Sequence, residues 1–431
     1  MSAPRSNERA SASRSNERAS ASRSNERARA RRLAGLVPVV RMRGRDVDER
    51  GRVSSPLELL FDLTFVAAVS AAVGPFAHAI EVDHVAEGIA PLLMVFFAIW
   101  WAWLNFTWFA SAYDTDDVPY RLLTMVQMGG VLVLAAGVQQ AFEVGDFTLP
   151  TIGYAIMRFA MVAQWLRVAA SDPESRATAL RYAIGISIVQ VLWIVRLFVT
   201  QGFPGWLLVV VFVLLALCEM AVPLVAERPR LTQWHPHHIA ERYGLFVIIL
   251  LGESVLASTV AVQQIVNAGA ATGLFVLLAA SALALLFGLW WIYFLEPAHE
   301  GLERRRSLSF WWGYGHYGIF VALTAAGAGL EAAVVSMEGH EGVDPTVVGY
   351  GVAAPVAVFL VLMWGLYRPL TGPTVIPPAV SLGAAAVVLL LPLAAHSVGI
   401  AVTILLIALT VAAVVATTIV YRRFRPPVSV D

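Results

Sequence analysis

Twelve apolar stretches, each about 20 residues long, occupy almost all of the chain after residue 50. A helix of that length matches the hydrocarbon thickness of a bilayer, so each stretch predicts one transmembrane helix. Backbone groups that face lipid must form hydrogen bonds within their own segment, which favours helices over open sheet or coil. We therefore predict an all-α, polytopic transmembrane helix bundle. The predicted spans are residues 56–76, 88–112, 120–142, 149–170, 177–200, 204–226, 240–263, 270–295, 310–335, 345–367, 378–396 and 398–421.

The connections between these spans alternate between arginine-rich and arginine-free. Cytoplasmic loops carry the excess of basic residues, so the alternation predicts an even number of spans with both termini in the cytoplasm. We expect a multi-pass protein of the bacterial cytoplasmic membrane. The basic residues that mark the predicted cytoplasmic side are Arg121, Arg176, Arg181, Arg228, Arg230, Arg242, Arg304, Arg305, Arg306, Arg368, Arg422, Arg423 and Arg425.

Residues 1–50 contain a nine-residue repeat that begins at Arg5, Arg14 and Arg23. Because residues 5–31 have almost no apolar residues, they cannot offset the entropy of ordering, and a disordered cytoplasmic tail over residues 1–50 is predicted. The repeats are either functional or the product of a slipped DNA repeat or a misplaced start codon. The arginines that precede the first span suit anionic lipid at the cytoplasmic face. Residues 426–431 are predicted to form a second, short cytoplasmic tail.

The composition argues against a soluble enzyme. Only 14% of the residues are charged, whereas about 25% are charged in ordinary soluble domains. The single cysteine, Cys218, rules out a disulfide or a thiolate metal cluster within one chain. The chain contains no phosphate-binding glycine loop, no GxSxG elbow and no HExxH motif. We therefore predict no enzyme activity, no cofactor and no nucleic-acid partner, and we expect the lipid bilayer as the main partner.

The chain shows a faint internal duplication. Asp62 precedes Trp100 by 38 positions, and Glu253 precedes Trp290 by 37. An even number of spans in each half leaves both halves in the same orientation. Chance similarity between tryptophan-rich apolar helices is the alternative. The predicted six-helix halves are residues 51–226 and 227–425.

Ionisable residues within the spans are the best candidates for function, because each costs about 2.5–3.5 kcal/mol at mid-bilayer unless it is paired or hydrated. Glu58 and Asp62 stand one turn apart on the first span, with Asp62 roughly 9 Å inside. Glu253 in the seventh span and Arg158 in the fourth reach the bilayer interior, at roughly 20 Å and 14 Å from the starts of their spans. We expect Arg158 to pair with Glu253 or Asp62 in one pocket where the halves meet.

Two interpretations of these charges remain open. In the first, they form a structural salt bridge that holds the halves together. In the second, Asp62, Glu253 and His316 change protonation or coordinate a cation along an ion path. Glu219 and Arg196 lie nearer the ends of their spans, so we expect them to extend to water.

A histidine-rich segment precedes the seventh span. His235, His237, His238 and Glu241 have a spacing at which a helix brings some of them to one face, so they are weak candidates for a metal site. Anchoring of the span at the interface explains the same residues. The tryptophans of the second and eighth spans, such as Trp100, are expected to serve in interface anchoring and core packing.

Two segments carry a family resemblance. ELLFDL runs from Glu58 to Leu63, and ERYGLFVIILLGES runs from Glu241 to Ser254. They resemble the E-x-x-F-D-L and ERFGLFxIIxLGES patterns of the bacterial low temperature requirement protein A family, across residues 50–425. The resemblance implies a multispanning membrane protein that the family's name links to growth in the cold. A fainter similarity, to lysosomal-type potassium channels built from two six-helix repeats, involves Arg52 and Phe61–Asp62.

The charged residues favour transport or conduction of a small cation or proton. Substrate or ion binding is predicted for Glu58, Asp62, Arg158, Glu241, Arg242, Glu253 and His316. The alternative is a noncatalytic scaffold or cold-adaptation protein with structural ion pairs, for which the Arg158 pair should be dry and tightly hydrogen-bonded.

Overall fold

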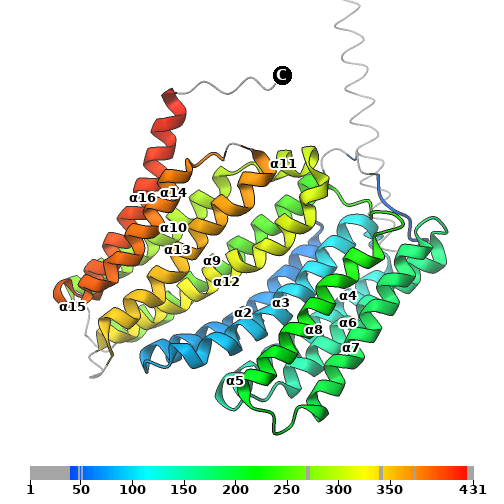
Figure 1. Ribbon diagram of the computed structural model, residues 1–431, viewed down its shortest axis with the longest axis horizontal. Helices are drawn as coiled ribbons and strands as arrows, with labels where there is room; N and C mark the ends of the chain where they lie inside the picture. Colours follow the sequence, from blue (N-terminus) through cyan, green and yellow to red (C-terminus); the bar gives the residue numbers. More distant parts are fainter. Residues whose placement is uncertain are drawn as a thin grey trace, which may run out of the picture.

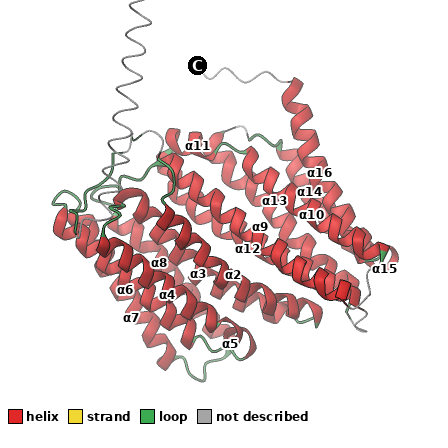
Figure 2. Cartoon of the chain, turned by 180° about the vertical axis from the view of Figure 1, so that it is seen from behind, coloured by secondary structure: helices red, strands yellow, loops and turns green. Residues whose placement is uncertain are grey.

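The computed structural model describes residues 39–46, 49, 52–267, 272–338, 343–372 and 374–424. Almost all of the predicted N-terminal tail, and all of the predicted C-terminal tail, lie outside these residues. Within them every regular element is a helix (Figures 1 and 2). The predicted all-α class is confirmed.

The helices reproduce the predicted spans closely. Ten helical segments among the described residues are long and apolar enough to cross a membrane, and α6 and α9, which carry more polar residues, bring the series to the predicted twelve. The first six spans are α2 (Pro56–Glu81), α3 (Val85–Tyr113), α4 (Val118–Ala136) with α5 (Val138–Glu143), α6 (Thr148–Ser171), α7 (Arg176–Val199) and α8 (Gly205–Ala226). The others are α9 (Pro236–Asn267), α10 (Gly273–Leu295), α12 (Ser309–Val335), α13 (Pro345–Thr371), α14 (Pro378–Leu390) with α15 (Ala395–Val398), and α16 (Ile400–Phe424), and the short α11 (Ala298–Arg304) precedes α12.

Local sequence signals fix where the helices begin. Ser55 caps α2 in a capping box: its hydroxyl accepts from the Glu58 backbone N–H at 3.3 Å, and the Glu58 carboxylate accepts from the Ser55 N–H at 2.6 Å. Pro56 follows at the first helical position, where its missing N–H costs nothing. Asp117 caps α4 in a similar way, accepting from the Tyr120 N–H at 3.0 Å. We call the face at which α2 and α9 begin the N-terminal face.

The helices form two groups that meet along α2. In one group α4 packs on α6, α6 on α7 and α7 on α8; in the other α12 packs on α9 and α13, α13 on α14, and α10 on α16. Helix α2 contacts α3 and α4 of its own group, and α9 and α12 of the other. Figure 1 shows the blue-to-green helices on one side and the yellow-to-red helices on the other. The predicted boundary at residues 226 and 227 falls in the connection between α8 and α9.

A close glycine crossing recurs in both groups. A Cβ atom added to Gly153 of α6 would lie 2.5 Å from the carbonyl oxygen of Gly130 in α4. One added to Gly329 of α12 would lie 2.4 Å from the carbonyl oxygen of Gly351 in α13. Small residues of this kind let helix backbones approach closely in membranes. The duplication into two parallel halves stays a prediction, which this recurrence supports.

The two tryptophan pairs that suggested the duplication lie in different environments. Trp100 and Trp101 of α3 are almost completely buried, whereas Trp290 and Trp291 of α10 are 45% and 48% exposed on the surface of the bundle. The first pair belongs to the core, and the second faces outward, where lipid would lie. Their equal spacing in the sequence therefore does not reflect equal positions in the fold.

Candidate functional site

Charged residues of α2 and α9 form a buried cluster where the two helix groups meet. Asp62 Oδ1 accepts from Arg242 Nη2 at 2.5 Å and from the indole N–H of Trp103 at 2.7 Å. Arg242 also donates to the hydroxyl of Thr107 at 3.3 Å. Asp62 and Arg242 each lie six residues into their helices, so both reach the same depth below the N-terminal face. We call Arg52, Glu58, Asp62, His238 and Arg242 the α2–α9 cluster.

Glu58 lies at the centre of this cluster. Its Oε1 is 3.2 Å from His238 Nε2, 3.6 Å from Arg242 Nη1 and 3.9 Å from Arg52 Nη2. Its other oxygen closes the capping box of α2. Glu58 thus links the start of α2 to α9 through an imidazole and two guanidiniums, and its side chain is fully buried.

Arg52 lies at the side of the cluster nearest the N-terminal face. Its Nη2 donates to the Ala110 carbonyl at the end of α3, at 2.7 Å, and the residue is 3% exposed. Burial, and to a smaller extent the charge of Arg45, lower the Arg52 pKa from its ordinary value, while Glu58 and Asp114 raise it. An arginine pKa starts so high that the side chain keeps its charge. With His238 neutral, two cations balance two carboxylates.

Asp114 lies near Arg52, just after the end of α3. Its carboxylate is 3.4 Å from Arg45 Nη1. Burial, and then the nearby charge of Glu58, raise the pKa of Asp114 to about 6, although Arg52 and Arg45 act in the opposite direction. The N-terminal face therefore holds a carboxyl group that titrates near neutral pH, above the α2–α9 cluster.

Several polar atoms of the cluster have unused hydrogen-bonding capacity. Asp62 Oδ2, Glu58 Oε1, Arg242 Nε and Nη1, and His238 Nδ1 are buried without a hydrogen-bond partner among the described residues. A buried group in this state costs free energy unless a water, proton or ion satisfies it. The cluster is therefore charge-balanced but incompletely hydrogen-bonded.

Arg158 does not join this cluster, and the prediction that it pairs with Asp62 or Glu253 is wrong. Arg158 Nη2 donates to Glu219 Oε2 at 2.7 Å, which links α6 to α8. Trp101 donates to the same oxygen at 3.0 Å, and the Tyr154 hydroxyl donates to the other at 3.0 Å. Glu219, expected to extend to water, is instead completely buried. Counting residues gave the depth of Arg158 but not the side of α6 from which it projects.

Glu253 also lies apart. It is eleven residues beyond Arg242 on α9, about 16 Å farther along the helix axis. The side chain is 4% exposed, and its Oε2 has no hydrogen-bond partner among the described residues. The neighbouring Ser254 packs against Gly327 of α12. The predicted single pocket with Asp62, Arg158 and Glu253 therefore does not form.

The remaining predicted site residues occupy two further places. His316 of α12 is completely buried, and its ring nitrogens contact the Trp312 carbonyl at 2.7 Å and the Tyr293 hydroxyl at 3.2 Å. Glu241 lies at the N-terminal face, where its carboxylate accepts from the Ser54 N–H at 3.4 Å. Glu241 therefore borders the α2–α9 cluster, and His316 belongs to an aromatic core.

The histidine-rich segment does not converge on one point. His238 faces Glu58, His237 packs against His299 with ring centroids 5.5 Å apart, and the ring of His235 faces the backbone of His238. Within the described part of the chain, no three histidine, cysteine, aspartate or glutamate side chains gather as metal ligands. The geometry does not support the metal alternative.

Sequence reasoning missed the burial of Glu219 and the role of two tryptophans as hydrogen-bond donors. Trp101 and Trp103 each donate an indole N–H to a buried carboxylate. The available signal was their position: both lie well inside the span, whereas tryptophans that anchor a helix lie near its ends. A buried indole N–H needs an acceptor.

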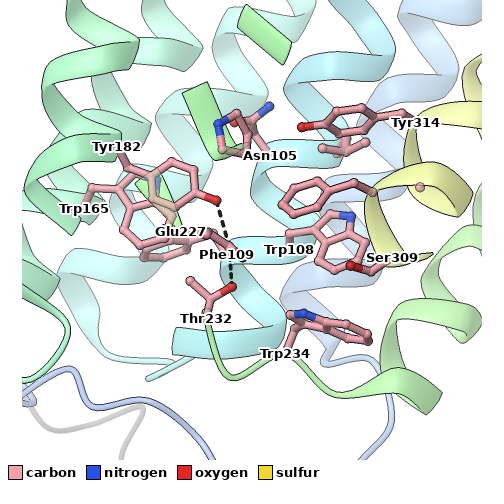
Figure 3. A pocket seen from close by; sticks show the side chains of 14 residues that line it. Asn105, Trp108, Phe109, Trp165, Tyr182, Glu227, Thr232, Trp234, Ser309 and Tyr314 are labelled. Carbon is pink, nitrogen blue, oxygen red and sulfur yellow. Dashed lines mark hydrogen bonds between the residues drawn. The ribbon is translucent and has the colours of Figure 1, made fainter. Parts of the chain in front are cut away.

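A small cavity opens between the first helix group and α12 near the N-terminal face. It has a volume of about 30 Å³, room for about one water molecule. Figure 3 shows Glu227 in its wall, accepting from the hydroxyls of Tyr182 at 2.9 Å and Thr232 at 2.7 Å. Burial raises the pKa of Glu227, and the two hydroxyls partly oppose this. Sequence patterns gave no sign of this cavity.

Comparison with known proteins identifies the family. The family model described as bacterial low temperature requirement A protein matches residues 53–419. The chain belongs to this family. Both motifs that carry the resemblance contribute to the α2–α9 cluster, the first through Glu58 and Asp62 and the second through Arg242.

A relative with limited coverage matches as well. An uncharacterized protein of Rhizobium meliloti is 32% identical over 262 residues, which cover 57% of this chain and 58% of the relative. The match thus spans less than two thirds of that protein's length. No solved structure matches the chain.

Proposed function

We propose that this low temperature requirement A protein conducts or transports protons across the bacterial cytoplasmic membrane, and that the α2–α9 cluster binds the proton. The observation that carries the proposal is a pair of carboxylates, Glu58 and Asp62, buried with an imidazole at the junction of the two helix groups. Ionisable groups inside a membrane bundle are expensive and commonly mark ion or proton pathways. In this proposal the arginine-rich N-terminal face and both termini lie in the cytoplasm.

Among small cations, the chemistry of the cluster favours the proton. Arg52 and Arg242 lie within 4 Å of Glu58 and would repel a metal ion. A metal ion such as Ca²⁺ or Mg²⁺ also needs about six oxygen ligands. A proton needs only one carboxylate oxygen or one imidazole nitrogen. His238, 3.2 Å from Glu58, offers that nitrogen.

Protonation would also change the contact between the helix groups. A proton on Asp62 cancels the charge with which Arg242 pairs, and the contact between α2 and α9 loses its strongest interaction. Re-ionisation restores the pair. The Asp62–Arg242 contact is therefore a two-state element through which proton binding at the N-terminal face can alter how α2 packs against α9.

Proton flux into liposomes that contain the purified protein tests this proposal. Under an imposed pH gradient, the wild type should acidify the lumen faster than protein-free liposomes. Asp62→Asn should reduce the rate at least about tenfold, because the amide cannot take up the transported proton. Glu58→Gln should have a similar effect. The control is Glu300→Gln, which removes a half-exposed carboxylate of α11. Equal flux in wild type and Asp62→Asn would refute the proposal.

A noncatalytic scaffold is the second candidate, and the Arg158–Glu219 pair favours it. Both oxygens of Glu219 accept hydrogen bonds, from Arg158, Trp101 and Tyr154, and the pair is buried. The carboxylate of Glu219 thus has the hydrogen bonds expected of a structural ion pair, although Arg158 Nε has no hydrogen-bond partner among the described residues. On this alternative, substitutions in the α2–α9 cluster or at the Arg158–Glu219 pair lower the yield of folded protein, and neither changes the proton flux.

A further inference from the structure

Arg196 is a buried cation for which the described part of the chain supplies no carboxylate partner. It lies three residues before the end of α7, at the face opposite the N-terminal face, and is only 7% exposed. The sequence predicted that it extends to water, but its side chain turns into the bundle. No carboxylate of the described residues forms a salt bridge with it, and its Nε has no hydrogen-bond partner among them.

Aromatic rings surround the guanidinium. The rings of Phe147, Trp193 and Phe212 have centroids 5.5, 5.9 and 5.8 Å from its Cζ atom. Cation–π contacts contribute about 0.5–2 kcal/mol each at best, whereas removing an ion from water costs several kcal/mol. Three such contacts offset much of this cost without neutralising the charge, so the guanidinium can still bind an anion.

A second donor at the same place also lacks a partner. The indole N–H of Trp193, one turn before Arg196 on α7, is buried without a hydrogen-bond acceptor among the described residues. Trp193 packs edge-on against Phe212, with centroids 4.9 Å apart. Trp193 lines a small cavity of about 30 Å³ that Arg196 also lines, so an unsatisfied N–H donor lies next to the positive charge.

An open cavity of about 550 Å³ reaches Arg196 from the opposite face. Phe147, Thr148, Thr200 and Gln201 contribute to its walls. A volume of this size accommodates a small organic ligand. Since Arg196 lines both this cavity and a smaller one of about 30 Å³ behind it, the guanidinium stands at the cavity floor.

We propose that this cavity binds a singly charged oxyanion, a carboxylate or a phosphodiester, through Arg196. The guanidinium matches two oxygens of such a group, and the rings of Phe142, Phe147 and Phe203 in the cavity wall offer contacts to an apolar body. Glu87 and Asp146 also line the cavity. The hydrogen bonds of Thr148 lower the pKa of Asp146, which keeps it ionised, so these walls repel a dianion more strongly than a monoanion. The site is independent of the α2–α9 cluster and of proton transport.

The ligand has two possible sources, a dissolved solute or a phospholipid headgroup. Isothermal titration of the purified full-length protein in a nonionic detergent can distinguish them. The probes are benzoate, dimethyl phosphate, the short-chain lipid dihexanoyl phosphatidylglycerol, and sulfate as the dianion. Saturable binding of benzoate or dimethyl phosphate identifies a solute site, and binding of the lipid alone identifies a headgroup site.

The variants are chosen so that misfolding cannot imitate the result. Arg196→Gln should weaken binding at least about tenfold, and Arg196→Lys, which keeps the charge, should weaken it less. Arg121→Gln removes an arginine from the N-terminal face, where it pairs with Asp116, and should bind like the wild type. The proposal is overturned if no probe saturates the wild type, if Arg196→Gln binds equally well, or if sulfate binds most tightly.

Discussion

Replacing Arg158 with methionine is expected to lower the free energy of unfolding by about 3–5 kcal/mol, because it leaves the Glu219 carboxylate buried and unpaired. Methionine keeps much of the arginine's length, so the effect reports the lost charge more than a lost volume. The measurement is the midpoint of thermal unfolding of the detergent-solubilised protein. After heating to each temperature, size-exclusion chromatography gives the fraction of protein that remains folded.

A double variant separates charge from packing. In Arg158→Met with Glu219→Gln, the glutamine carbonyl can take the place of the oxygen that accepts from Trp101, and its NH2 group can donate to the Tyr154 hydroxyl. No unpaired charge remains. We expect it to recover most of the lost stability, as removing both partners of a buried ion pair usually does. If the double variant were as unstable as the single one, the Arg158–Glu219 pair would not be the source of the effect.

Replacing Gly153 with leucine is expected to prevent α4 and α6 from packing. Even a Cβ atom at this position would lie 2.3 Å from the Leu134 backbone nitrogen, and a backbone atom cannot move aside as the tip of a side chain can. We expect a loss of at least about 3 kcal/mol, observed as a low yield of monodisperse protein in detergent.

A matched glycine in the facing helix provides the control. Gly129 of α4 is exposed, and an added Cβ there would meet no heavy atom of the described residues within 4 Å. Gly129→Leu should leave the yield and the thermal midpoint near those of the wild type. Loss of folded protein in both variants would show that helix flexibility, not close packing, makes glycine necessary.

The number and order of the membrane spans were predictable because each span is marked by its own stretch of apolar residues. Apolar length set the twelve spans, and the predicted start of the first span at residue 56 is the start of α2. These signals are local, as a span must satisfy its own backbone in lipid whatever its neighbours are. The prediction of α2 and α9 as carriers of buried charge likewise needed only the positions of Asp62 and Glu253 in their spans, whereas Arg242, taken as a marker of the cytoplasmic side, is buried as well.

Pairing was not predictable in the same way. Depth along the membrane normal follows from counting residues, but partner choice also depends on which face of a helix meets which neighbour. Arg158 was paired with Glu253 or Asp62 on depth alone, whereas α6 presents Arg158 to Glu219 of α8. Arg196 is a similar case: its nearness to the end of α7 suggested water, and only the packing of α7 against its neighbours places it inside an aromatic cage.

The most direct test of the central claim is an infrared difference spectrum of the purified protein between about pH 5 and pH 8, where histidine and perturbed carboxyl groups exchange protons. If the α2–α9 cluster binds the transported proton, acidification should produce the carbonyl-stretch band of a protonated carboxylic acid, and Asp62→Asn should remove or shift part of that band while Glu300→Gln leaves it unchanged. An identical spectrum in wild type and Asp62→Asn would show that Asp62 exchanges no proton and would contradict the account.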